Sequence, residues 1–170
     1  MRGDAKLLAF GLGTFHAVIL TLTLVLSLYL AADLGEALDS LNTGIGLAVF
    51  GALWATSVYC TDRALRDAGL KLGRALSVAG ILRNGEIWGA WNGVLFFWCL
   101  LVGGTVAVFI SEVDDGLVAI PRVLFVAIFG FGVGTVVSAI FGAAVGFVIA
   151  TVDMTLQWAG RSVAGVSSSE

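Results

Sequence analysis

Charged residues are scarce in this chain, making up 12% of its 170 residues, whereas soluble domains carry about 25%. Hydrophobic residues make up 59%, and most of them fall in four long runs. Each run is long enough to cross a hydrocarbon core of about 30 Å at about 1.5 Å per helical residue. The longest polar connection, residues 62–86, is too short to form a hydrophobic core of its own. The composition therefore excludes a soluble globular domain and predicts a multi-pass protein of the cell membrane.

Cysteine and histidine are also rare, with two cysteines and one histidine. Cys60 and Cys99 lie inside predicted helices without a second Cys or a His at ligand spacing, so neither a structural disulfide nor a metal site is expected. The glycine-rich run at residues 130–134 lacks the Lys-Ser/Thr ending of a phosphate loop and lies in an apolar span. We therefore predict no catalytic, cofactor-binding or metal-binding residue and no nucleic-acid partner. A membrane-embedded enzyme is the weakest of the functional hypotheses.

The apolar runs predict an all-α fold with four transmembrane helices in one domain, residues 1–152. A basic connection with a short amphipathic helix joins the second and third helices, and a polar tail follows the fourth. The expected spans are about 7–32, 43–61, 87–110 and 120–151, with the connection at 62–86 and the tail at 153–170.

The basic connection is amphipathic when read as a helix. Arg63, Lys71 and Arg74 share one face with Asp67, and leucine and alanine side chains occupy the other. A helix of this kind lies flat on a membrane surface, where each Lys or Arg contributes about 1 kcal/mol of attraction to anionic lipid headgroups. We expect these three basic residues to bind such headgroups, and docking of a protein partner is the alternative.

The distribution of Lys and Arg predicts the orientation. The N-terminus, the middle connection and the tail hold all basic residues except Arg122, whereas the first and third connections hold six acidic residues. Because basic residues are retained on the cytoplasmic side, both termini should be cytoplasmic and both acidic loops external.

Small residues recur at every fourth position of the fourth span: Gly130, Gly134, Ser138, Gly142, Gly146 and Ala150. Such stripes allow membrane helices to pack closely. Four residues turn an α-helix by about 400°, so the stripe drifts by about 40° per step and by about 200° over its length. The sequence therefore leaves two alternatives, a single partner that crosses steeply or two partners that share the stripe.

The second and fourth spans share a sequence segment. Residues 48–52, Ala-Val-Phe-Gly-Ala, resemble residues 139–143, Ala-Ile-Phe-Gly-Ala. This match suggests a tandem repeat of a two-helix hairpin, although such matches also arise by chance in a chain of this composition. In the repeat, Gly51 and Gly142 occupy equivalent packing positions.

Few polar groups lie within the spans. His16, Thr56, Thr135 and Ser138 are the residues that we expect to line a polar pathway if one exists. The alternative is that His16 bonds a neighbouring helix and that each hydroxyl bonds the preceding turn of its own helix. No Asp, Glu, Lys or Arg lies deep in an expected span as a partner for His16, which argues against a transporter that relies on buried acids.

These patterns predict a small non-enzymatic membrane protein that acts by helix packing. In this interpretation the chain works as a homo-oligomer or as an accessory subunit of a membrane complex, in contact with the lipid bilayer. The alternative is a small channel or permease for a small solute or ion.

Overall fold

A computed structural model describes residues 2–30, 43–67, 78–111, 124 and 128–163. This part of the chain contains four long α-helices and one π-helical turn: α1 (Arg2–Leu30), α3 (Thr43–Asp67), α4 (Val78–Ser111), η2 (Gly130–Gly134) and α6 (Thr135–Val163). Four helical segments are long and apolar enough to cross a membrane: Lys6–Ser27, Thr43–Asp67, Val78–Ala107 and Gly130–Thr155. The all-helical class and the four apolar helices of this length are therefore confirmed.

The helices extend beyond the expected spans. α3 ends at Asp67 instead of residue 61, and α4 begins at Val78 instead of residue 87. Both ends of the predicted connection at 62–86 thus belong to long helices, since alanine, leucine and arginine, which have good helix propensity, occur at both ends. The centre of that connection, with Lys71 and Arg74, lies outside the described residues. α6 likewise continues to Val163, past the expected end of the fourth span at 151.

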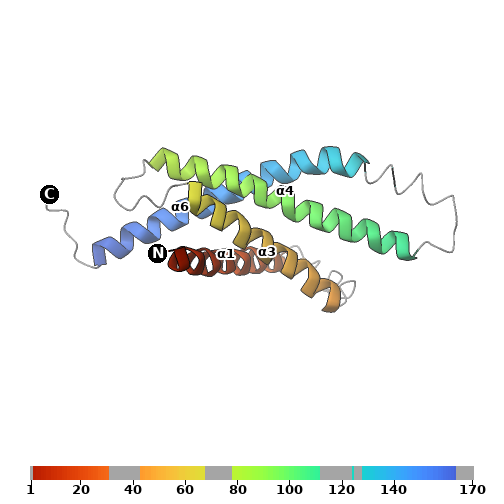
Figure 1. Ribbon diagram of the computed structural model, residues 1–170, viewed down its shortest axis with the longest axis horizontal. Coiled ribbons are helices and arrows are strands. Elements are labelled where there is room, and N and C mark those ends of the chain that lie inside the picture. The colour runs from red at the N-terminus through yellow and green to blue at the C-terminus, as the bar shows by residue number, and fades with distance from the viewer. Residues whose placement is uncertain (1, 31–42, 68–77, 112–123, 125–127, 164–170) are drawn as a thin grey trace.

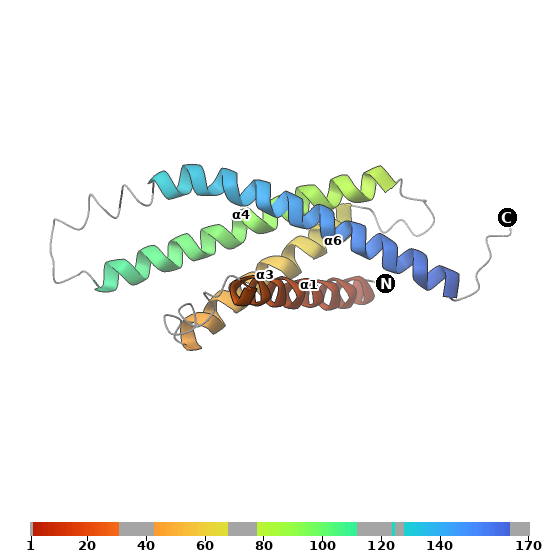
Figure 2. The same ribbon diagram turned by 180° about the vertical axis from the view of Figure 1, so that it is seen from behind.

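The helices form two antiparallel hairpins, α1 with α3 and α4 with α6. Figures 1 and 2 show that the start of α1, the end of α3, the start of α4 and the end of α6 lie on the same side of the molecule. α3 and α4 meet on that side and diverge toward the other, so the two hairpins form a V. Extended packing joins α4 to α6, α1 to α3, and α3 to α4 among the described helices.

The contact between α4 and α6 is the most extensive in the described structure. The helices cross as an X in both views (Figures 1 and 2), as expected when rows of every fourth residue interdigitate. A Cβ atom built on Gly89 would lie 2.6 Å from Cα of Gly146, and one built on Gly93 would lie 3.1 Å from Cα of Gly142. Neither helix could carry larger side chains there without moving away.

The small-residue stripe meets a single partner along its length. Its residues face every fourth residue of α4, in the pairs Gly130–Leu101, Gly134–Phe97, Ser138–Gly93, Gly142–Gly89 and Gly146–Gly85, and Ala150 also faces Gly85. Of the two alternatives left by the sequence, the structure has the single partner that crosses. Gly51 lies elsewhere, because a Cβ built on it would meet nothing within 4 Å in the described structure. Its expected equivalence to Gly142 therefore does not extend to a close contact within this chain.

The described part of the chain buries small side chains and exposes large ones. The buried apolar residues are Ala9, Ala17, Cys60, Val94 and Ala150, whereas most leucine, valine and phenylalanine side chains point outward. On α1, a Cβ built on Gly13 would lie 2.5 Å from Cα of Val58, so α1 and α3 also approach closely. This distribution is typical of helices whose outer faces contact lipid tails, where exposed apolar surface has no cost.

Candidate functional site

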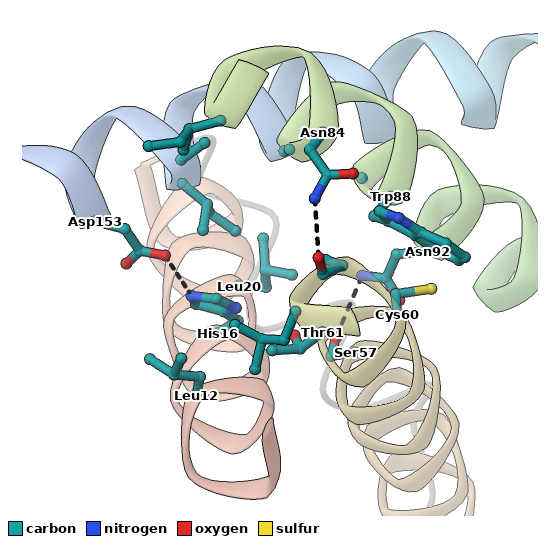
Figure 3. Close-up of a pocket in the computed structure, with 18 of the residues that line it drawn as sticks. Leu12, His16, Leu20, Ser57, Cys60, Thr61, Asn84, Trp88, Asn92 and Asp153 are labelled. Atoms are coloured by element: carbon teal, nitrogen blue, oxygen red, sulfur yellow. Dashed lines mark hydrogen bonds and ion pairs between the residues drawn. The ribbon is translucent and has the colours of Figure 1, made fainter. Parts of the chain in front are cut away.

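A cavity of about 270 Å³ lies where the two hairpins meet, lined by residues of all four long helices. Glycines make room for it on one side, since Gly85, Gly89 and Gly146 contribute only backbone. Six leucine, isoleucine and methionine side chains form the apolar part of the remaining wall together with alanine and tryptophan. Figure 3 shows several polar side chains among them, from α1, α3, α4 and α6. An apolar pocket with a few convergent polar groups is the usual form of a small-molecule site.

His16 enters this cavity from α1. Its Nε2 atom lies 3.4 Å from Oδ2 of Asp153 on α6, and 14% of the His16 side chain is exposed (Figure 3). This distance is longer than a normal hydrogen bond, and Nε2 is buried without a hydrogen-bond partner in the described structure. His16 and Asp153 thus form a close pair that leaves the imidazole nitrogen free to bond a third group.

The partnership with Asp153 corrects the expectation that His16 has no ionisable partner. Asp153 lies beyond the expected end of the fourth span and was assigned to the tail. α6 continues past that point, and its crossing brings Asp153 next to α1. The length of an apolar run does not show whether polar residues beyond its end lie in the same helix and contact a neighbouring helix.

The polar face of α4 repeats every fourth residue and points toward α3. Nδ2 of Asn84 donates to the Ala64 carbonyl at 2.9 Å, Nε1 of Trp88 donates to Asp67 at 3.1 Å, and Nδ2 of Asn92 donates to Oγ of Ser57 at 3.3 Å. Oδ1 of Asn92 is buried without a hydrogen-bond partner among the described residues. The cavity wall therefore carries two unpaired buried polar atoms, Oδ1 of Asn92 and Nε2 of His16.

Sequence reasoning missed Asn84, Trp88, Asn92 and Asp153 as site residues. The signal for the first three was the spacing on α4, because residues 84, 88 and 92 share one helix face next to the glycines at 85, 89 and 93. Two asparagines, four residues on either side of a tryptophan, are polar groups that require partners in a membrane.

The other three residues of the expected polar pathway lie apart from the cavity. The hydroxyl of Thr56 donates to Ala52 at 3.0 Å, and that of Ser138 donates to Thr135 at 3.1 Å. The Thr135 hydroxyl donates to Phe131 and accepts a 3.0 Å bond from Nε1 of Trp98. Each hydroxyl thus bonds its own helix, and the structure does not bring these residues together with His16.

Arg63, expected at lipid headgroups, is exposed near the end of α3, with its guanidinium 5.3 Å from the ring centre of Tyr59. Its neighbour Arg66 pairs with Asp62 at 2.6 Å. Both cysteines are free, with Cys60 on the cavity wall and Cys99 exposed. In the described part of the chain, no group of three His, Cys, Asp or Glu side chains could hold a metal ion.

Comparison with known proteins identifies the family of the chain. Residues 5–170 match DUF7965, a family of unknown function, and the chain belongs to that family. No curated protein and no solved structure matches it. The match covers every residue that lines the cavity.

Proposed function

We propose that this chain is a multi-pass protein of the cell membrane that acts by helix association, as an oligomer or as an accessory subunit of a membrane complex. The open V of its hairpins carries this proposal. Among the described helices, α1 packs extensively along α3 alone, and α6 packs extensively along α4 alone. In a closed four-helix bundle each helix packs against neighbours on both sides. The faces that stay open toward the wide end of the V are available to a second chain.

Gly51 offers a direct test, because it lies on α3 facing open space. Leucine at this position fits the single chain but would block close approach of another helix. We expect Gly51→Leu to lower the fraction of assembled protein at least fivefold, as measured by native mass spectrometry from lipid nanodiscs, without lowering the thermal stability of the single chain.

Gly46→Leu is the matched control. Gly46 lies on the same helix and also has nothing within 4 Å, but five residues turn the helix by about 500°, which places it about 140° away from Gly51. This variant should assemble like the wild type. Wild-type protein that leaves native membranes as a single copy, without a partner in stoichiometric amount, would disprove the proposal.

The orientation, the lipid contacts and the repeat belong to the same proposal. Both termini are cytoplasmic, and Arg63, Lys71 and Arg74 of the basic connection bind anionic headgroups. The positions of Lys6, Arg63 and Arg83 support this orientation, since they lie near the helix ends that share one side of the molecule (Figure 1). The two antiparallel hairpins have the arrangement expected of a tandem repeat. Labelling of single cysteines in the loops from either side of the membrane tests the orientation.

The alternative function is a small channel or permease. The cavity supports it, whereas the hydroxyl groups that were expected to line a pathway do not. Thr56, Thr135 and Ser138 bond their own helices, so a pathway would pass His16 and Asn92. Uptake of glycerol by proteoliposomes, compared with protein-free liposomes, tests this function. Equal uptake rates would exclude glycerol as a substrate.

A further inference from the structure

We propose that the four-helix cavity binds a small, neutral amphiphile through a hydroxyl group. The class of ligand follows from the unpaired atoms. Oδ1 of Asn92 is an acceptor without a donor, and Nε2 of His16 donates or accepts according to its protonation. A hydroxyl is the simplest group that both donates and accepts a hydrogen bond. One hydroxyl or two adjacent hydroxyls would therefore supply the hydrogen-bond partners that these two atoms lack. A buried polar atom left without a partner is costly in a membrane.

The charge of the lining favours a neutral ligand. Asp153 and His16 are the carboxylate and the imidazole of the cavity wall, and they lie side by side, 3.4 Å apart, without a hydrogen bond between them. A carboxylate ligand would meet the charge of Asp153 at close range, which is unfavourable in surroundings of low dielectric. A neutral hydroxyl adds no like charge beside Asp153.

The volume of the cavity and its apolar lining indicate what the rest of the ligand, beyond its hydroxyl group, must be. The cavity of about 270 Å³ has the volume of about nine liquid waters at about 30 Å³ each, which corresponds to a ligand of about ten non-hydrogen atoms. Leu12 and Leu20 on α1 and Ile149 on α6 face this space, so the body of the ligand is apolar. A medium-chain alcohol or the glyceryl end of a monoacylglycerol meets these requirements.

Trp88 provides a reporter for binding, because it lines the cavity (Figure 3). The experiment uses the full chain in lipid nanodiscs and three probes of equal length: 11-bromoundecanol, 1-bromoundecane and 11-bromoundecanoate. Bromine quenches tryptophan fluorescence on contact. We expect saturable quenching by the alcohol at about tenfold lower concentration than by the alkane, the difference that one hydrogen bond makes.

Two pairs of variants locate the binding. Trp88→Phe should remove the saturable quenching, whereas Trp91→Phe should retain it, since Trp91 is 50% exposed and does not line the cavity. Asn92→Leu should abolish the preference for the alcohol over the alkane. Thr135→Val is its control, because it also removes a hydrogen bond between helices, the one from Trp98 of α4, but Thr135 does not line the cavity.

The probes also distinguish the competing outcomes. If monoolein displaces the bromoalcohol at lower concentration than undecanol does, the ligand is a membrane glyceride, and the reverse order indicates a free alcohol. Both results support the proposal. Equal quenching by all three probes, tighter binding of the carboxylate, quenching that persists in Trp88→Phe, or an alcohol preference that survives Asn92→Leu would overturn it.

Discussion

α4 makes two contacts of opposite kinds on adjacent faces. Toward α6 it presents Gly85, Gly89 and Gly93, which allow the two backbones to meet. Toward α3 it presents Asn84, Trp88 and Asn92, whose side chains form hydrogen bonds. The two rows are one residue apart, or about 100° around the helix.

The difference reflects what holds helices together in lipid. Burial of apolar side chains gives no net advantage there, because lipid tails are equally apolar. Close packing of backbones and polar bonds are the remaining sources of affinity, and α4 uses one on each face. The glycine face tolerates no added side chain, whereas the polar face should tolerate the loss of single bonds.

The largest effect is expected when the glycine face is blocked. Gly89→Leu places a side chain where even a Cβ would lie 2.6 Å from Cα of Gly146, and we expect the free energy of unfolding to fall by about 3 kcal/mol. The measurement is unfolding in mixed micelles by titration with denaturing detergent. Gly103→Leu is the control on the same helix. Gly103 has nothing within 4 Å, so leucine there should raise stability by up to about 1 kcal/mol through helix propensity. Equal losses in both variants would show that α4 and α6 do not meet at these glycines.

An intermediate effect is expected when a bond of the polar face is removed. Asn84→Ala deletes the 2.9 Å bond to Ala64, and we expect the free energy of unfolding to fall by about 1 kcal/mol, within the range of interhelical bonds in membranes. The same titration measures it. A loss as large as that of Gly89→Leu would contradict the distinction between the two faces.

The smallest effect is expected when the hydrogen bond between Trp98 and Thr135 is removed. This variant tests whether the contact between α4 and α6 depends on that bond. Thr135→Val removes the acceptor of the Trp98 bond between α4 and α6, and we expect a loss of about 0.6 kcal/mol in the free energy of unfolding. Thr151→Val is the control, since its hydroxyl is exposed and bonds Phe147 of its own helix. A loss above about 2 kcal/mol would exceed the measured range for such bonds. It would mean that this hydrogen bond, and not the close packing of the two backbones at the glycines, stabilises the contact between α4 and α6.

The sequence was sufficient for the helices and insufficient for the site. Apolar length predicted the four helices, and the four-residue spacing predicted a close packing surface on α6, because both depend on local periodicity. The partner of that surface could not be predicted, since the glycines of α4 and those of α6 have the same spacing as several other small residues. The His16–Asp153 pair was missed because it depends on the tilt of α6, and tilt is set by packing between helices.

The π-helical turn at Gly130–Gly134 helps the first step of the stripe to stay on the crossing partner. A π turn closes i→i+5 bonds and so holds more residues than an α turn. The step from Gly130 to Gly134 therefore rotates less than the roughly 400° of an α-helical step, which offsets the drift of the stripe. It also means that η2 contains a residue that an α-helix would not need. Loss of one residue here would be absorbed by a change to α-helix, whereas loss of one residue within α6 would rotate every side chain on one side of the deletion by about 100°. Among the described parts of this hairpin, η2 is where the chain should tolerate a change of length.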